Sequence, residues 1–353
     1  MAEINRNSMI ISKLTLTDEK AYIDFLQRAY RGQFNSYRFE SRHDIKEFWH
    51  WEYIDNPHKI TGKPLVWICR AGEDIVGQLC VMPVTVKISG RSYTGGWCQD
   101  FMVLPEFRGR GIGQQLVHEV KMGLSDSVDI TMAVIATERS RALFRKQGFM
   151  EIGEINKNIS LRMVSGILLW FRRLNAGKSI EIQESDAFDV EFDNVWEYIS
   201  EKFNCLIKRD KEVLRWRFAP QPHWAYRAFI AKEGNIPKGY VIVKVKKYDL
   251  IGQKSFNTGI ISDVFFDPSE THIGRALIEK ALKIMKNKVA VVRCDVMNPS
   301  AQRFLRTAGF VGIKSDNMFL LCLSERVAKE DAALARNRNS WYITYGDSDL
   351  DFS

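Results

Sequence analysis

The sequence contains an internal repeat, which constrains its fold more than any other feature. At a distance of 161 positions the segment 113–149 aligns with 274–310 without a gap, and Gly113 falls on Gly274. Such self-similarity indicates one structural unit that is present twice in the chain. Each copy is expected to form an amphipathic helix, a buried strand and a second helix that stops at a Gly-Phe pair. The expected ranges are 113–124, 129–137 and 140–149 in the first copy, and 274–285, 288–296 and 300–310 in the second.

The correspondence continues upstream with small insertions. Residues 43–53 resemble residues 209–218, which makes Trp51 the expected counterpart of Trp216. A hairpin with a Gly-containing polar turn is predicted after each of these segments. The two hairpins are expected at 65–84 and 226–245. The predicted fold class is therefore mixed α/β, with an α+β-like order: two tandem repeats, each a mostly antiparallel sheet flanked by helices.

The length of 353 residues fits two domains of ordinary size. We expect an N-terminal domain at 1–162, a connecting segment at 163–185, a second domain at 186–325 and a C-terminal tail at 326–353. The tail reads as a helix followed by a short strand and an acidic end. The connecting segment has a short apolar run before two arginines, which predicts packing between the two halves. Docking of this segment on an anionic membrane surface is the alternative.

Composition argues against several classes of protein. No apolar run approaches the roughly 20 residues that cross a bilayer, and the first residues lack the apolar core of a secretory signal. The six cysteines are scattered without a C-x-x-C pair, and the six histidines show no metal-ligand spacing, so no metal is expected. The prediction is a soluble, cytoplasmic protein without a membrane span. The net charge of +8 favours anionic partners, but Lys and Arg are spread along the chain, which argues against nucleic acid.

The sharpest motif lies where an apolar strand, 101–104, leads into a Gly-rich loop and an amphipathic helix. The loop runs from Arg108 to Gly113 and contains a second arginine, Arg110. Backbone N–H groups at the start of a helix are unpaired and carry the positive end of the helix dipole. Glycines let this backbone approach an anion closely, and the arginines add positive charge. The pattern therefore predicts a diphosphate-binding site.

The loop lacks the Gly-Lys-Ser/Thr ending of a P-loop and the G-x-G-x-x-G turn of a dinucleotide-binding fold. It resembles motif A of the GCN5-related N-acetyltransferases, Q/R-x-x-G-x-G/A, at Arg108, Gly111 and Gly113. The lead into this motif is matched by Val103, Pro105 and Phe107. A second family element, N-x-x-A-x-x-L-Y-x-x-x-G-F, is resembled at Thr137, Ser140, Leu143, Phe144, Gly148 and Phe149.

The second half resembles the same family less completely. It follows the second element at Asn298, Ala301, Phe304, Leu305, Gly309 and Phe310. Its phosphate loop is broken, because Ser269 and His272 stand where the first half has Arg108 and Gly111. The resemblance therefore implies one working cofactor site, in the first repeat. The degenerate second repeat would help to shape the acceptor pocket or act as a structural partner.

The resemblance implies acetyl-CoA, or another acyl-CoA, as co-substrate and an amine as acceptor, with no metal. In the family, the strand before motif A parts from its neighbour and frees backbone N–H groups for the thioester carbonyl and the pantetheine. The residues that would bind the cofactor are Phe101, Met102, Val103, Arg108, Gly109, Arg110, Gly111, Ile112, Gly113, Thr137 and Phe144.

A general base is expected on or near this strand. Asp100 is the nearest carboxylate and the first candidate, and Glu138, just after the following strand, is the second. Phe144 departs from the family, in which a tyrosine often stands at this position and is proposed to protonate the departing thiolate. Because a thiol with a pKa of about 8.5 can leave without an acid, we expect this change to weaken activity rather than abolish it.

We therefore predict an acyl-CoA-dependent N-acyltransferase that moves an acetyl group from acetyl-CoA to a primary amine by direct attack in a ternary complex. The acceptor is expected to be a small molecule (an amino sugar, an amino acid or a polyamine) rather than a protein. Two alternatives stay open: a Fem-like transferase with an aminoacyl-tRNA donor, and a non-catalytic acyl-CoA-binding protein. The aromatic residues of the first half either pack in the core or line the acceptor pocket. They are Trp49, Trp51, Tyr53, Trp67, Tyr93 and Trp97.

Overall fold

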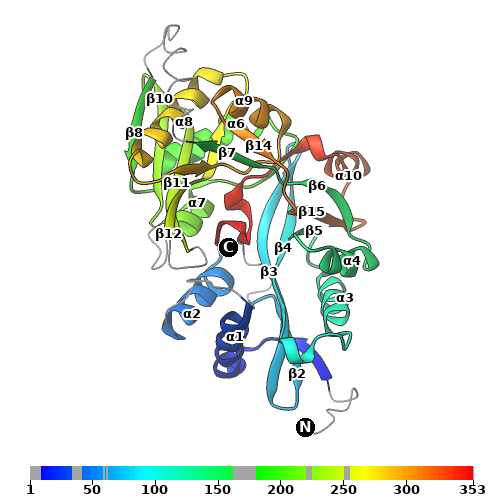
Figure 1. Ribbon diagram of the computed structural model, residues 1–353. Helices are drawn as coiled ribbons and strands as arrows, with labels where there is room; N and C mark the ends of the chain where they lie inside the picture. The colour runs from blue at the N-terminus through cyan, green and yellow to red at the C-terminus, as the bar shows by residue number, and fades with distance from the viewer. Residues whose placement is uncertain are drawn as a thin grey trace.

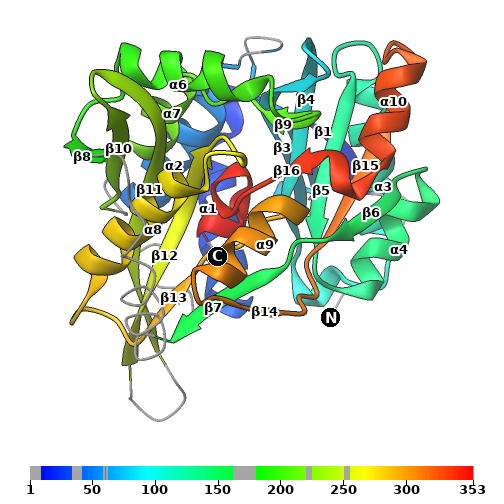
Figure 2. The same cartoon turned by 90° about the horizontal axis from the view of Figure 1, so that it is seen from above.

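Two mostly antiparallel β-sheets, each flanked by helices, make up the protein in the computed structural model (Figures 1 and 2). The structure describes residues 9–33, 42–58, 60, 63–161, 180–219, 225–249 and 255–352. Each sheet is formed mainly from one half of the chain. The predicted mixed α/β class and its two repeats are confirmed.

The first sheet has the strand order β1-β2-β3-β4-β5-β15-β6. Along this path its strands are β1 (Met9–Lys13), β2 (Val66–Ala71), β3 (Asp74–Ile88), β4 (Arg91–Val103), β5 (Ile130–Ile135), β6 (Met150–Glu154) and β15 (Met318–Leu323). Two further short strands, described below, join this nine-stranded sheet at β3. Helices cover both faces of this sheet (Figure 1). The pair on one face is α1 (Glu19–Gln33) and α2 (Arg42–Trp49), and the pair on the other is α3 (Ile112–Leu124) and α4 (Glu138–Lys146).

The second sheet repeats this arrangement, with the order β14-β7-β13-β12-β11-β10-β8. Its strands are β7 (Lys157–Leu161), β8 (Ile180–Ser185), β10 (Arg227–Glu233), β11 (Ile236–Asp249), β12 (Ser255–Phe266), β13 (Val291–Arg293) and β14 (Val311–Ile313). Its helices are α6 (Val190–Ser200), α7 (Lys211–Phe218), α8 (Thr271–Met285) and α9 (Pro299–Thr307). Both predicted hairpins are present, as β2–β3 and β10–β11, and the predicted helix-strand-helix order is present in both halves.

Each half contributes an interior strand to the sheet of the other half. Strand β7 comes from the first half but lies in the second sheet between β13 and β14, where Ser160 pairs with Val292. Strand β15 comes from the second half but lies in the first sheet between β5 and β6, where Leu320 pairs with Ala133. Each sheet is therefore completed by a strand from the other half, and the expected boundaries at 162 and 325 fall just after these exchanged strands. Residues 163–179 of the predicted connecting segment lie outside the described residues. Its last six residues form the edge strand β8.

The C-terminal tail lies between the two halves. The predicted helix and strand are present as α10 (Lys329–Arg336) and β16 (Trp341–Tyr342), and β16 pairs with β9 (Cys205–Ile207). The Trp341 side chain is fully buried in an apolar cluster with residues of β3 and β4. The acidic end is buried as well: Asp347 forms an ion pair with Arg209, and Asp351 forms one with Lys244. Buried charges are tolerated when they are paired and hydrogen-bonded, which these contacts provide.

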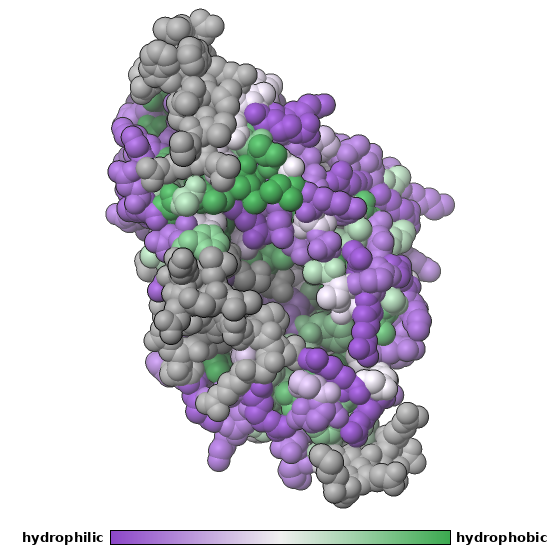
Figure 3. Space-filling view, in the orientation of Figure 1, coloured by the Kyte–Doolittle hydropathy of each residue, from purple (hydrophilic) through white to green (hydrophobic). Residues whose placement is uncertain are grey.

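The molecular face in Figure 3 is mostly hydrophilic. A hydrophobic patch lies over the region of β7 and β14, and Val311 and Ile313 of β14 are exposed. In the described part of the chain, no helix has both the length and the apolar character that a membrane span requires.

Two tryptophans join the repeats through a symmetric contact. The rings of Trp51 and Trp216 stack with centroids 5.3 Å apart and an angle of 25° between their planes. The indole N–H of Trp51 donates to the Trp216 carbonyl over 2.8 Å, and that of Trp216 donates to the Trp51 carbonyl over 2.9 Å. A contact in which residue i meets residue j and residue j meets residue i in the same way indicates a two-fold relation. The predicted correspondence of these residues is therefore confirmed.

Replacing either tryptophan with alanine is expected to lower the free energy of unfolding of the full chain by about 2–3 kcal/mol. This loss is at or below the loss for a fully buried tryptophan, because both rings are half-buried. In the double variant W51A/W216A, the loss should be smaller than the sum of the single losses by about 1 kcal/mol, because both single changes remove the same stack and the same pair of hydrogen bonds. Urea denaturation measures these free energies of unfolding, with I236A as the control at an exposed hairpin turn. Additive losses would contradict a direct coupling of the repeats through this pair.

Candidate active site

Strands β4 and β5 pair along only part of their length. Their parallel register runs from Gly95 opposite Ile130 to Cys98 opposite Ala133. Beyond this point β4 continues to Val103 beside β3, and β5 continues to Ile135 beside β15. Over Gln99–Val103 the edge of β4 that faces away from β3 is therefore not paired with any of the described strands. This part of β4 therefore has an unpaired backbone edge, which the predicted cofactor site requires.

The Gly-rich loop at the end of β4 has an open, positively polarised surface. Gly109 and Gly111 have φ angles of +78° and +87°, in the left-handed region that favours glycine, and a Cβ built at either would meet no atom within 4 Å. Gly111 is the N-cap residue of α3, and no side chain caps this helix. The first N–H groups of α3 are thus not capped by a side chain, as an anion-binding loop requires.

Two arginines stand beside this helix start, both with exposed side chains. The Nε atom of Arg108 donates to the Val103 carbonyl over 3.0 Å. The Nη2 atom of Arg110 donates to the Glu106 carbonyl over 3.1 Å, and its guanidinium lies 5.2 Å from the centre of the Phe107 ring. These bonds hold both guanidinium groups at the loop and still leave N–H donors on each one. The loop therefore combines fixed positive charge with uncapped backbone donors.

Several residues predicted to contact the cofactor pack in the core with their side chains. Phe144 is fully buried, with its ring 5.9 Å from that of Phe101 and 5.0 Å from that of Phe149. A Cβ on Gly113 would come within 3.0 Å of the Phe101 ring, so this glycine allows α3 to approach β4. The side chains of Met102 and Ile112 are also buried. Near the Gly-rich loop, Met102, Ile112 and Phe144 therefore do not offer their side chains to a ligand.

Thr137 and Glu138 lie at the start of α4. Thr137 is the N-cap residue, and its hydroxyl accepts from the Ser140 N–H over 3.3 Å. The Glu138 side chain is 62% exposed and forms ion pairs with Arg145 and with Arg141. The hydrogen bond from Arg145 holds the pKa of the Glu138 carboxyl below its usual range. A carboxylate that is exposed and held by two arginines is a weak proton acceptor.

Asp100 lies in a β-bulge of β4, at the point where the register with β3 shifts. Its φ angle is +49°, a left-handed conformation that Asp adopts more readily than most residues. The Tyr53 hydroxyl donates to Oδ2 of Asp100 over 3.0 Å, and the Tyr30 hydroxyl donates to Oδ1 over 3.3 Å. The Gln78 side chain donates to the Asp100 backbone carbonyl over 3.0 Å. The bulge thus turns the Asp100 carboxylate toward α1 and α2, while the neighbouring Phe101 packs against α3 and α4.

A polar chain holds Tyr53 in place behind Asp100. The buried Gln99 amide donates to the Tyr53 hydroxyl over 3.0 Å and also to the Glu52 carboxylate. Burial, together with the Asp100 charge, raises the pKa of Tyr53 well above its ordinary value. Tyr53 therefore keeps its proton and acts as a hydrogen-bond donor to Asp100.

A small pocket borders this carboxylate. It is lined by Tyr22, Leu26, Tyr30, Ile45, Phe48, Trp49, Tyr53 and Asp100. Of the aromatic residues singled out in the sequence, Trp49 and Tyr53 line this pocket, whereas Trp67 and Trp97 are buried in the apolar core. Sequence reasoning missed Tyr22 and Tyr30. Their spacing with Leu26, four residues apart on α1, is the signal that places all three on one helix face.

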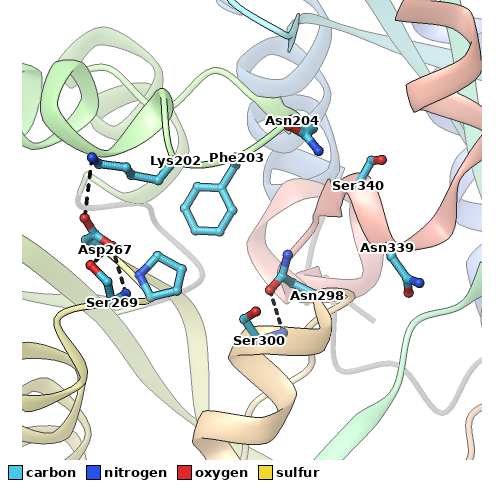
Figure 4. A pocket seen from close by; sticks show the side chains of 10 residues that line it. Lys202, Phe203, Asn204, Asp267, Ser269, Asn298, Ser300, Asn339 and Ser340 are labelled. Atoms are coloured by element: carbon cyan, nitrogen blue, oxygen red, sulfur yellow. Dashed lines mark hydrogen bonds and ion pairs between the residues drawn. The ribbon is translucent and has the colours of Figure 1, made fainter.

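The corresponding loop of the second repeat is closed by its own side chains. Oδ1 of Asp267 accepts from both the backbone N–H and the hydroxyl of Ser269, over 2.8 and 2.7 Å. His272 forms a 2.7 Å contact with Glu233. Figure 4 shows the pocket at this place, where Asp267 lies between Lys202 and Ser269, and Asn298 caps the helix that begins at Pro299. The carboxylate occupies donors that a diphosphate would need, which agrees with the broken motif.

The described residues contain no cluster of three or more His, Cys, Asp or Glu side chains that could hold a metal ion. The groups that the first repeat offers for chemistry are the loop, the exposed strand edge and the Asp100 pocket. All three lie along β4 and its continuation into α3.

Comparison with known proteins agrees with this geometry. A model of the acetyltransferase (GNAT) domain matches residues 62–151, and a model of the acetyltransferase (GNAT) family matches residues 192–310. A search of curated proteins finds no match.

Solved structures of the same fold cover most of the chain. A GCN5-related N-acetyltransferase from Anabaena variabilis has a TM-score of 0.62 at 12% identity, over 89% of this chain and 72% of that one. A probable N-acyltransferase from Enterococcus faecalis has a TM-score of 0.64 at 13% identity, over 90% and 73%. N-myristoyltransferase of Saccharomyces cerevisiae, with bound myristoyl-CoA, has a TM-score of 0.61 at 13% identity, over 91% and 80%. With one family match on each repeat and this shared fold, the chain is a tandem-repeat member of the GCN5-related N-acetyltransferase superfamily.

Proposed function

We propose that this chain is an acyl-CoA-dependent N-acyltransferase that moves an acetyl group from acetyl-CoA to the primary amine of a small molecule, in the cytoplasm. One observation carries the proposal. The same strand, β4, presents the Asp100 carboxylate in a pocket on one face of the sheet and leads at its end into an uncapped, arginine-flanked helix start. An amine site and a diphosphate site are thereby joined through a few residues of unpaired strand edge.

The residues of the first repeat fit the cofactor. The open space over Gly109 and Gly111 would admit the diphosphate, with Arg108 and Arg110 beside it. The edge of β4 at Phe101, Met102 and Val103 would offer backbone groups to the pantetheine and the carbonyl. Thr137 would border that space, whereas the Phe144 ring lies in the core. Bound acyl-CoA supplies a thioester, whose carbonyl carbon is the electrophile.

Asp100 would serve as the base. An ammonium ion has no lone pair, so the acceptor must lose a proton before it can attack. The hydroxyls of Tyr30 and Tyr53 fix the two oxygens of Asp100 in the pocket, where the carboxylate can take this proton directly or through water. In the whole reaction one N–C bond forms and one C–S bond breaks. One proton of the ammonium goes to Asp100, and a second one neutralises the departing thiolate.

Phe144 supports a second candidate, a non-catalytic acyl-CoA-binding protein. Its ring is fully buried and cannot protonate a thiolate. A thiol is nevertheless a good leaving group, and the positioning of two reactants alone can supply about 7–11 kcal/mol of the barrier reduction. We therefore favour the enzyme. Binding of acetyl-CoA without release of thiol in the presence of any amine would favour the binding protein instead.

Gly111→Ala is expected to weaken binding of acetyl-CoA by about tenfold or more, because the added methyl group enters the space in which the diphosphate would meet the helix start. Gly90→Ala is the matched control. Gly90 has a φ of +84°, close to the +87° of Gly111, and a Cβ there also meets no atom within 4 Å, but it lies in the turn between β3 and β4. Both substitutions strain the backbone, but only Gly111→Ala adds a methyl group at the predicted diphosphate site. Calorimetric titration of both variants with acetyl-CoA therefore separates these two effects on the affinity. Equal affinities would place the cofactor elsewhere.

Asp100→Asn should lower kcat by about 10²–10⁴-fold while the affinity for acetyl-CoA stays unchanged, because the amide cannot accept the proton. Asparagine is the suitable replacement, since it also adopts left-handed conformations and has the same shape. Glu138→Gln, the control for the second candidate base, should leave kcat within about twofold, as expected for a surface ion pair. Thiol release in a coupled assay measures both rates. A large loss in E138Q with normal rates in D100N would reverse the assignment.

A further inference from the structure

We propose that the second repeat binds a small phosphomonoester with a hydroxyl-bearing carbon skeleton, of the sugar phosphate class, in a groove beside its closed loop. The inference is independent of the acyl transfer proposed for the first repeat, because it concerns a different cavity. It follows from the size of this groove, its charge and its polar lining.

The groove consists of two adjoining cavities that are open to solvent. The first, which we call the arginine cavity, lies between the start of α8 and one side of α9 and has a volume of about 610 Å³. The second is the cavity of Figure 4, with a volume of about 420 Å³. Pro268, Ser269 and Ser300 line both cavities, so the two are continuous. Volumes of this order are typical of pockets that hold small ligands.

Two arginines give the arginine cavity its charge. Arg275 comes from α8 and Arg303 from α9, and both line the cavity. The Nη2 atom of Arg303 donates to the Ser300 hydroxyl over 3.2 Å, which holds this guanidinium at the cavity. Within the described part of the chain, neither arginine forms an ion pair with a carboxylate, and no acidic side chain lines the cavity. Two uncompensated positive charges therefore face one space.

The first repeat carries its positive charge at a different place. At the offset of 161 positions, Arg275 and Arg303 correspond to uncharged residues of the first repeat, Gln114 and Ala142. The two loop arginines of the first repeat correspond in turn to a serine and a threonine. The second repeat thus has its charge on two helices and not at the loop, where Asp267 occupies the donors of Ser269. An anion would be held here by side chains rather than by the loop backbone.

The charge and the hydroxyl groups of the arginine cavity fit a phosphate group. A phosphomonoester has a charge of about −1.5 to −2 near pH 7, which matches two guanidinium groups, whereas a carboxylate matches only one. Guanidinium groups donate paired hydrogen bonds to phosphate oxygens. The hydroxyls of Thr271 and Ser300 also line the cavity and can donate to the remaining oxygens.

The cavity of Figure 4 suits the carbon skeleton of such a ligand. Its charged residues, Lys202 and Asp267, form an ion pair over 3.9 Å and add no net charge. The other polar residues that line it carry amides or hydroxyls, which donate and accept hydrogen bonds as the hydroxyls of a sugar do. They are Asn204, Ser269, Asn298, Ser300, Asn339 and Ser340. The groove thus has a positively charged end for a phosphate and a neutral polar end for a hydroxyl-bearing chain.

Ser340 supplies a separate indication of a ligand in this cavity. The residue is only 5% exposed, and it lines the cavity. Its hydroxyl makes no hydrogen bond with another residue that the structure describes. Because a buried hydroxyl without a partner costs free energy, this group favours a hydrogen-bonding partner that enters the cavity.

The test uses calorimetric titration of the full-length protein with glycerol 3-phosphate, ribose 5-phosphate and glucose 6-phosphate. Glycerol, ribose, glucose and inorganic phosphate are the matched probes. We expect at least one phosphomonoester to bind about tenfold or more tightly than both its unphosphorylated counterpart and inorganic phosphate, because only the ester can occupy both cavities. Its affinity should fall from about pH 7.5 to about pH 5, because the phosphate gains a proton with a pKa of about 6. If no ester binds, or if inorganic phosphate binds as tightly, the inference is wrong.

Arginine variants locate the bound ester. Arg275→Ala and Arg303→Ala should each weaken its binding by about tenfold, because each removes charge-assisted hydrogen bonds. Arg306→Ala removes an exposed arginine of α9 that lines neither cavity, and this matched control should change the affinity by less than about twofold. Arg108→Ala, in the first repeat, should also leave the affinity unchanged.

Equal unfolding temperatures of these variants would show that a loss of affinity is local to the groove. Weaker binding in R108A, with normal binding in R275A and R303A, would place the anion at the loop of the first repeat and overturn the inference. None of these titrations contains acetyl-CoA. A negative result therefore leaves the proposed acyl transfer unaffected, and the two proposals can fail separately.

Discussion

The exchange of strands β7 and β15 is the constraint on which the rest of the structure depends. Strand β15 pairs with β5 along its whole length, from Met318 opposite Ile135 to Leu323 opposite Ile130. Strand β5 is also the neighbour from which β4 separates after Cys98. The position of the unpaired edge of β4 in the first repeat is therefore fixed by a strand from the second repeat. The second half is part of the site's framework even though its own loop is closed.

The two repeats share a fold but differ in the chemistry that they present. Both have a helix that starts after a long strand, yet the first starts at an open Gly111 and the second at a loop whose donors are taken by Asp267. The exchanged strands and the stacked tryptophans hold the two halves in a fixed arrangement. Because such packing tolerates changes in loops, one repeat can keep a ligand site while the other gives it up.

Much of the fold could be predicted, because the repeat and its periodic patterns are local. The pairing of Trp51 with Trp216 follows from two similar helices, and the phosphate loop follows from glycines and arginines in order. The strand exchange could not be predicted, since alternating apolar residues define the faces of a strand and not its neighbours. The pocket beside Asp100 could be predicted only in part, because Tyr22, Trp49 and Asp100 meet through tertiary packing. Phe144 matches a family position, yet only the packing shows that its ring belongs to the core.

The place of β15 in the chain has a consequence for synthesis. The first sheet needs this strand between β5 and β6, but residues 318–323 leave the ribosome after almost all of the second half has been made. Until then β5 and β6 expose the edges that β15 will occupy, and unpaired edges invite wrong partners. The first half thus cannot reach its final form as a nascent domain. The time during which the growing chain is vulnerable to aggregation, and in need of chaperones, extends over the synthesis of the whole second half.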